Sequence, residues 1–194
     1  GDLNDPGNRL RESVFFHKAL QCFWIGHTER CRYYSEKCMP ILGTLAQLNT
    51  YMSKFYHGLN SLDMLRKNIN SPKAKAVVRA AIAAMKEAAA SSDWNFTNKL
   101  RLLEAEQQSL RLNHHKAIPL YDASIKSAKK SGFIHEQGLA CEKAGFYFIG
   151  ENNKEKALEY FKQARECYEG WGSSMKVDFI LTKLDSLNGQ QLLR

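Results

Sequence analysis

The spacing of apolar residues predicts helices along almost the whole chain. Apolar positions recur every three or four residues, which is the period of a helix with one buried face. No segment shows the strict alternation typical of a β-strand. The pattern predicts helices over residues 11–25, 28–39, 41–67, 72–90, 94–112, 114–130, 135–150, 153–169 and 173–187. We therefore expect an all-α fold.

The breaks between these segments carry known start and stop signals. Ser71 precedes Pro72, which fits a serine N-cap followed by proline in the first helical turn. Gly26 and the Gly170-Trp171-Gly172 run stand where helices should end. The connections are short, so consecutive helices should pack antiparallel. We expect a flexible N-terminal segment over residues 1–10 and a single helical repeat domain over residues 11–194.

Two stretches of the chain repeat each other at a constant offset, the one that separates Lys116 from Lys156. The match holds at an alanine, an aromatic residue and a glycine in each stretch: Ala117, Tyr121 and Gly132 in the first, and Ala157, Phe161 and Gly172 in the second. A fixed period of this size is typical of stacked helix pairs, because one pair cannot bury its apolar face alone.

The pair over residues 138–172 matches the tetratricopeptide pattern best. Gly145 falls where the first helix needs a small residue, and Phe148 where an aromatic residue is expected. Ala157, Phe161 and Ala164 form the stripe of the second helix that we expect to be buried. We predict a right-handed superhelix of about four antiparallel pairs. The last helix should cap the stack with an apolar side made of Val177, Ile180, Leu181 and Leu184.

Composition and charge describe an ordinary folded chain with a basic surface. Of the 194 residues, 44% are hydrophobic and 25% are charged, which is typical of soluble folded proteins. The net charge of +8 favours anionic partners at long range. No apolar run approaches the roughly 20 residues needed to cross a bilayer, and there is no secretory signal pattern. We expect a cytoplasmic protein with no membrane span.

The five cysteines favour free thiols over a disulfide framework, because their number is odd and no CxxC pair occurs. Cys31 and Cys38 stand at positions of the second helix where small residues pack. Cysteine behaves as a small apolar residue when buried, so we interpret both as packing residues.

Catalytic and metal-binding patterns are weak. His27 and Cys31 stand four residues apart and His114 is followed by His115, but adjacent histidines on a helix diverge by roughly 100°. No nucleophile motif or phosphate-binding glycine loop occurs. We expect no enzyme activity, no metal and no cofactor.

A partner-binding groove is the functional site that the helical pattern favours. The first helices of successive pairs line the concave surface of such stacks, where an extended peptide or a helix can lie. The register places nine residues on that face: Phe16, Leu20, Phe23, Lys99, Leu102, Glu106, Glu142, Phe146 and Ile149. The same side chains could equally pack between helix pairs.

An alternative hypothesis is a basic helical platform for RNA or anionic lipid. The cations that could meet phosphates are Lys126, Lys129 and Lys130 together with Arg66, Lys67, Lys73, Lys75 and Arg79. No nucleic-acid-binding motif accompanies them, and lysines scattered over helix faces mostly serve solubility. Nucleic acid is therefore the less favoured partner.

Several strings resemble one family. They are Phe55-Tyr56-His57-Gly58-Leu59, Trp94-Asn95-Phe96, Gly132-Phe133-Ile134-His135-Glu136 and Cys167-Tyr168-Glu169-Gly170-Trp171. Together they are similar to the tetratricopeptide-like region of very large signalling ATPases, and the resemblance spans about residues 11–185. In these proteins, kinase-like and NTPase modules precede the repeats, and a GAF, histidine kinase or nucleotide cyclase module often follows. The resemblance implies that the repeats act as a sensor, a scaffold or an autoinhibitory arm that couples partner binding to a neighbouring ATPase or output domain. We therefore predict a non-catalytic protein-interaction module that binds a peptide, a helix or a neighbouring domain.

Overall fold

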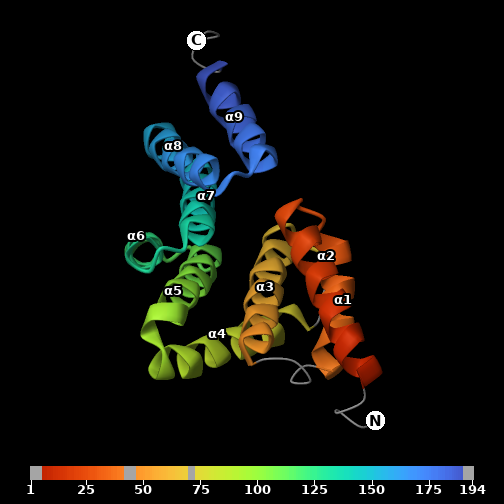
Figure 1. Ribbon diagram of the computed structural model, residues 1–194. Helices are drawn as coiled ribbons and strands as arrows, with labels where there is room; N and C mark the ends of the chain where they lie inside the picture. Colours follow the sequence, from red (N-terminus) through yellow and green to blue (C-terminus); the bar gives the residue numbers. More distant parts are fainter. Residues whose placement is uncertain (1–5, 42–46, 70–72, 190–194) are drawn as a thin grey trace. The chain divides into compact units, whose positions relative to one another are not determined.

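The computed structural model describes residues 6–41, 47–69 and 73–189, and within these ranges the chain is helical without a strand (Figure 1). The elements in chain order are α1 (Pro6–Trp24), α2 (Thr28–Cys38), the 3₁₀ turn η1 (Met39–Ile41), α3 (Gln47–Arg66), α4 (Ala74–Ser91), α5 (Asp93–Leu110), α6 (His114–Lys130), α7 (Ile134–Gly150), α8 (Lys154–Trp171) and α9 (Ser174–Gly189). The predicted all-α class is confirmed.

The helix boundaries differ from the prediction mainly at two starts. Helix α1 begins at Pro6, inside the segment expected to be flexible, because proline is well tolerated in the first helical turn. The helix predicted from residue 41 instead follows a 3₁₀ turn that contains Pro40, and α3 begins at Gln47. The serine cap predicted at Ser71 and the proline at Pro72 lie outside the described residues.

The chain packs as two compact units, Gly1–Asp93 and Trp94–Arg194, here called unit 1 and unit 2. The expectation of one continuous repeat domain over residues 11–194 stays a prediction.

One type of joint ends a helix at six places in the described residues. A residue with positive φ follows the helix, and the amide of the next residue bonds to the carbonyl five residues back. This is the Schellman arrangement, which satisfies carbonyls that the helix end leaves without partners. The positive-φ residues are Gly26, Asn68, Leu112, Gly132, Asn152 and Gly172. Leu112 is the exception in chemistry, because glycine and asparagine commonly adopt positive φ whereas leucine rarely does.

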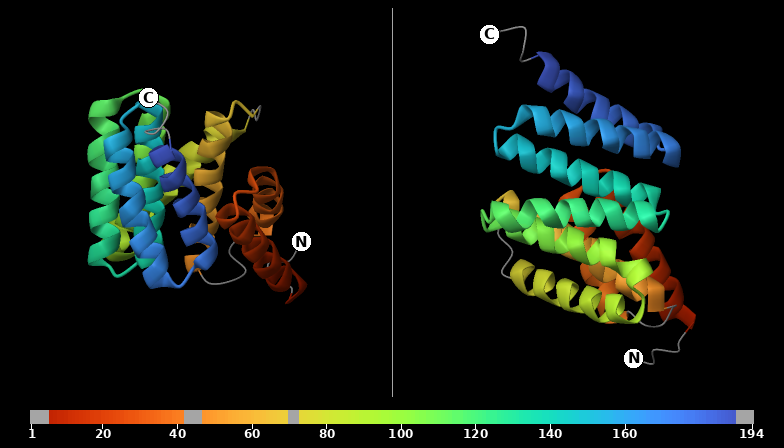
Figure 2. Two further views of the ribbon diagram at one scale, coloured as in Figure 1. Left: turned by 90° about the horizontal axis from the view of Figure 1, so that it is seen from above. Right: turned by 90° about the vertical axis from the view of Figure 1, so that its left-hand side faces the viewer.

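Unit 2 repeats this joint at a constant interval. Its four positive-φ residues, at positions 112, 132, 152 and 172, are evenly spaced, and α5 to α8 have nearly equal lengths of 18, 17, 17 and 18 residues. The constant interval accounts for the repeat in the sequence, since two helices and two joints make one period. Figure 2 shows these helices lying one above another in chain order.

Close contacts between α7 and α8 depend on two glycines. A Cβ at Gly145 would lie 2.7 Å from the Phe161 ring, and a Cβ at Gly138 would lie 2.8 Å from the Tyr168 ring. Ala157, Phe161 and Ala164 are fully buried, as predicted, and Phe148 stacks on Tyr160 with ring centroids 5.4 Å apart. The small and aromatic side chains of this pair therefore pack closely between α7 and α8.

Helix α9 packs on α8 through Ile180 and Leu184, which are both buried. Leu181, expected on the same side, is 37% exposed, because it points about 100° away from Ile180 around the helix. The buried side of α9 is thus narrower than the four residues predicted.

Unit 1 is held by small side chains and aromatic rings. Cys31 and Cys38 are buried, which confirms their packing role. Burial raises the pKa of the Cys31 thiol to about 12 and that of Cys38 to about 11, so both stay protonated at neutral pH. Helix α4 packs on α3 with Val78, Met85 and a row of alanines.

Candidate functional site

The predicted groove residues are mostly covered. Phe16, Lys99, Leu102, Glu106 and Glu142 are buried, Leu20, Phe23 and Phe146 are half-buried, and Ile149 is 37% exposed. The first helices of unit 1 supply three of these residues, and those of unit 2 supply six. The two groups belong to different units and are therefore described separately.

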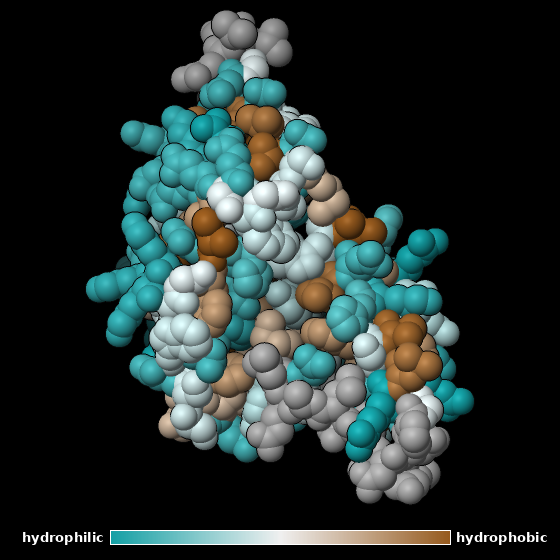
Figure 3. Space-filling model, in the orientation of Figure 1, coloured by the Kyte–Doolittle hydropathy of each residue, from teal (hydrophilic) through white to brown (hydrophobic). Residues whose placement is uncertain are grey.

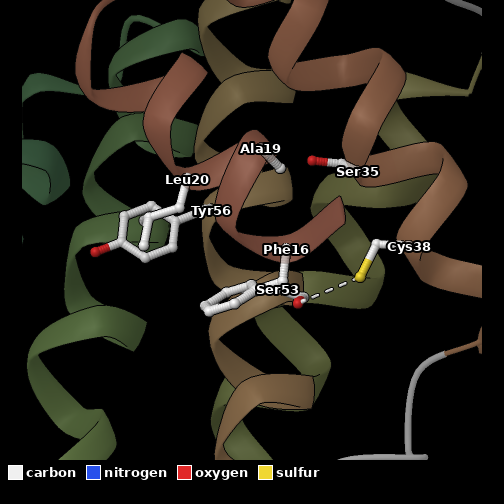
Figure 4. Close-up of a pocket in the computed structure, with 7 residues that line it drawn as sticks. All are labelled: Phe16, Ala19, Leu20, Ser35, Cys38, Ser53 and Tyr56. Atoms are coloured by element: carbon white, nitrogen blue, oxygen red, sulfur yellow. Dashed lines mark hydrogen bonds between the residues drawn. The ribbon is translucent and has the colours of Figure 1, made fainter. Parts of the chain in front are cut away.

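The three residues of unit 1 pack α1 against α2 and α3. Phe16 and Leu20 border a small cavity of about 10 Å³ that is also lined by Ala19, Ser35, Cys38, Ser53 and Tyr56 (Figure 4). Phe23 packs against Tyr56 with ring centroids 5.0 Å apart and the ring planes tilted by 59°. A cavity of this size is at the lower limit for one water molecule, so it offers no room for a larger ligand.

Lys99 of α5 forms a buried ion pair with Glu136 of α7. The Lys99 Nζ lies 2.7 Å from Glu136 Oε2, and both side chains are at most 4% exposed. Lys99 also donates to the Asn95 carbonyl, and Asn98 donates its amide to the same carboxylate. The ammonium lies 4.6 Å from the centre of the Phe133 ring, within cation–π range. The charge of Lys99 is therefore neutralised inside the unit.

A second buried pair joins Glu142 of α7 to Lys176 of α9. The Lys176 Nζ lies 2.6 Å from Glu142 Oε2, and the Tyr168 hydroxyl donates to the same oxygen at 2.6 Å. Burial and the neighbouring Glu142 raise the pKa of Tyr168 well above its usual value, so the phenol stays a donor. The ammonium lies 4.7 Å from the centre of the Phe179 ring.

Two further carboxylates each accept a tyrosine hydroxyl. Tyr121 donates to Glu106, which is buried. Tyr160 donates to Asp122 at 2.6 Å, and its pKa is raised, first by burial and then by this bond. Together with Glu136 and Glu142, these groups are engaged in structural contacts, which leaves no free carboxylate pair for acid–base chemistry among them.

The accessible part of the first-helix face of unit 2 is a short apolar row on α7 and α9. It consists of Phe146, Ile149, Met175 and Phe179, and we call it the α7–α9 row. The rings of Phe146 and Phe179 lie 6.1 Å apart, and Lys183 places its ammonium 5.0 Å from the Phe179 ring centre. In Figure 3, brown apolar groups lie over α9 between teal hydrophilic groups.

The histidine and cysteine side chains do not come together in a metal site or in an accessible thiol site. His114 Nδ1 lies 2.8 Å from the Tyr147 hydroxyl and 3.0 Å from the Glu151 carboxylate. In the part of the chain that the structure describes, no group of three or more side chains could hold a metal ion. A hydrogen bond between the Cys141 and Cys167 thiols raises the pKa of Cys141 and lowers that of Cys167. Both thiols are buried.

Comparison with other proteins adds no assignment. No protein-family model, curated protein or solved structure matches the chain. Over the described residues, no helix combines the length and the apolar character that a membrane crossing requires.

Sequence reasoning missed the partners of Lys99 and Glu142. These partners, Glu136 and Lys176, are separated by one full period of the repeat and so occupy equivalent positions of it. The sequence did contain a signal for these partners, because Glu136 and Lys176 place opposite charges at the same position near the start of two apolar-rich helices. The second missed feature is Phe179, which extends the accessible row from α7 onto α9.

Proposed function

We propose that the chain is a non-catalytic protein-interaction module of a signalling protein. Its helices form a right-handed, tetratricopeptide-like superhelix with α9 as the cap. The repeated joints and the glycine contacts of α7 with α8 support this arrangement. Following the family resemblance, the module binds a peptide, a helix or a neighbouring domain and so regulates an attached ATPase or output domain.

The α7–α9 row is the observation that carries the proposal. Met175 and Phe179 are 47% and 38% exposed on one stripe of α9, and Phe146 continues the stripe onto α7. Apolar side chains presented this way suit the apolar anchors of a bound helix or extended peptide. The neighbouring charges of Glu142 and Lys176 neutralise each other, so partner binding does not have to desolvate either of these two groups as a free charge.

A peptide selection with matched variants tests this proposal. Peptides selected from a random display library against the whole chain are labelled, and their affinities are measured by fluorescence anisotropy. Phe179→Glu should weaken binding at least about tenfold, since a central anchor carries more than about 1.4 kcal/mol. Leu181→Glu is the control, because Leu181 is 37% exposed on the same helix but lies outside the row.

Equal losses for the two variants, or no loss for Phe179→Glu, would contradict the proposal. Phe179 is a better probe than Lys99 or Glu142, because changing either charge would break a buried ion pair and destabilise the unit. Circular dichroism of each variant checks that the helices remain folded.

A further inference from the structure

An exposed aromatic patch lies at one end of unit 2, where three chain segments meet. It consists of Trp94 at the start of α5, Phe133, Ile134 and His135 at the start of α7, and Trp171 at the end of α8. Trp94 is 54% exposed, Trp171 40% and Ile134 37%. Large side chains rarely stay this exposed in one place without a binding role.

The patch contains two pairs of neighbouring rings. The rings of Trp94 and Phe133 lie 5.1 Å apart, and those of His135 and Trp171 lie 5.4 Å apart. Ile134 reaches α8 next to Trp171, because its Cδ1 would lie 2.7 Å from a Cβ at Gly170. The five side chains thus gather where the starts of α5 and α7 meet the end of α8.

Hydrogen bonds and a cation–π contact hold residues of the patch in place. Ser131 donates its hydroxyl to the Trp94 carbonyl at 2.9 Å, which ties the end of α6 to the start of α5. The Phe133 amide bonds to the Ala128 carbonyl in the joint after α6. Phe133 also rests on the Lys99 ammonium. A surface ordered before binding loses little side-chain entropy when a partner docks.

Three lysines border the patch on the side of α6. Lys126, Lys129 and Lys130 occupy the last two turns of α6, directly before the joint that leads to Phe133. None of them forms an ion pair with a described residue, and Lys126, Lys129 and Lys130 are all exposed. The acidic residue of α6, Asp122, is engaged by Tyr160. The edge of the patch is therefore positively charged.

We propose that this end of unit 2 binds an acidic peptide segment that carries an apolar anchor residue. The anchor rests on Trp94, Ile134 and Trp171, and the carboxylates of the peptide meet Lys129 and Lys130. Aromatic anchors surrounded by a polar rim are the usual centre of protein interfaces. This site is separate from the α7–α9 row, and its test does not depend on the outcome at that row.

The geometry favours a peptide over single-stranded nucleic acid. Base stacking needs open ring faces, whereas Phe133 has a face covered by Lys99 and Trp171 lies beside His135. A peptide side chain needs only apolar contact, which exposed ring edges provide.

The test uses the whole chain and a synthetic peptide that combines a central Leu-Phe anchor with flanking Asp and Glu residues. Binding is measured by fluorescence anisotropy of the labelled peptide. Trp94→Ala should weaken it at least about tenfold, and K129E/K130E should do the same at low ionic strength. Tyr33→Ala, which removes a 52% exposed ring of unit 1, and Lys116→Glu, at the start of α6, should each leave the affinity within about twofold.

Three results would overturn the proposal. The first is equally tight binding of a peptide that carries Lys in place of the acidic residues. The second is a loss of peptide affinity in Lys116→Glu that equals the loss in K129E/K130E. The third is a thymidine oligonucleotide that binds more tightly than the acidic peptide and competes with it, since that would assign the patch to nucleic acid. Phe179→Glu leaves acidic-peptide binding unchanged if the two sites are separate, which distinguishes failure here from failure at the α7–α9 row.

Discussion

Units 1 and 2 use the same joint but differ in regularity. The described joints of unit 1, at Gly26 and Asn68, are separated by α2, η1 and α3, whereas in unit 2 a joint follows every helix from α5 to α8 at the same interval. Helix lengths explain the difference, because α2 has 11 residues and α3 has 20, while α5 to α8 have 17 or 18. A common joint therefore produces a regular stack only where the helices between joints match in length.

The interiors of the two units differ as well. Unit 2 buries two lysine–glutamate pairs between its first helices, whereas the described core of unit 1 consists mainly of cysteine, alanine, methionine and aromatic side chains. Buried pairs are weak sources of stability but are costly to break. Unit 2 should therefore tolerate the loss of a single charge much less well than unit 1 tolerates the loss of a single thiol.

The largest expected effect comes from breaking a buried pair in unit 2. Lys99→Met leaves Glu136 buried without its cation and should lower the free energy of unfolding by about 3–5 kcal/mol. Chemical denaturation measures the loss, and hydrogen exchange should locate it in α5 to α9. Lys116→Met, which changes an exposed lysine of α6, is the control and should cost less than about 0.5 kcal/mol.

The double variant K99M/E136Q sharpens this test. Removing both charges should restore part of the stability, because the glutamine leaves no uncompensated charge in the core. If Lys99→Met lowered the free energy of unfolding no more than Lys116→Met does, the claim that unit 2 is sensitive to the loss of one buried charge would be wrong.

A smaller loss is expected from filling the contact between α7 and α8. Gly145→Ala places a methyl group against the fully buried Phe161 ring and should cost about 1–3 kcal/mol. Gly150→Ala is the matched control in the same helix, since nothing lies within 4 Å of the added Cβ. Thermal unfolding measures the loss. Equal melting temperatures for the Gly145 and Gly150 variants would contradict the conclusion that α7 and α8 need a glycine at position 145 to pack closely.

The packing role of cysteine in unit 1 can be tested by exchanging sulfur for oxygen. Cys31→Ser introduces a hydroxyl group at a fully buried position and should cost about 1–2 kcal/mol. Cys31→Ala keeps the site apolar and should cost less. The opposite order in urea denaturation would indicate that the thiol acts through polar contacts.

The smallest expected effect is on the pH dependence of stability. In each unit, one histidine has a pKa that burial shifts. Burial lowers the pKa of His57 in unit 1 and of His135 in unit 2; Glu36 opposes the shift at His57 and Arg32 adds to it. The unfolded chain therefore takes up a proton first as the pH falls. The stability contributed by neutral His57 is complete above about pH 6.5 and is lost as the pH falls toward the lowered pKa.

His57→Gln should flatten this dependence in unfolding measurements between pH 7 and pH 5. The same change at His135 should have a weaker effect, because that side chain is 32% exposed, whereas His57 is 5% exposed as a residue. Identical pH profiles for the wild type and His57→Gln would contradict the prediction.

Local packing could be predicted from the sequence better than the site could. Helical periodicity located most helices, and Gly145 and Cys31 were read correctly because small residues at fixed repeat positions have one simple explanation. Leu112 carries no sequence signal for its positive φ, since leucine rarely adopts it. Lys99 and Glu142 were placed on an open face because a helical pattern shows which side a residue occupies, but not which neighbour covers that side.

The joints of unit 2 also give every helix pair the same backbone ends. Each joint closes with backbone bonds alone, and the chain enters and leaves a pair with the same geometry. A cut made at Leu112 and another at Asn152 would remove one full period and leave ends that rejoin in register. The length of this architecture can therefore change by whole pairs without a new loop, but the buried charges must be replaced as well, because removing this period would set Lys99 opposite Lys176.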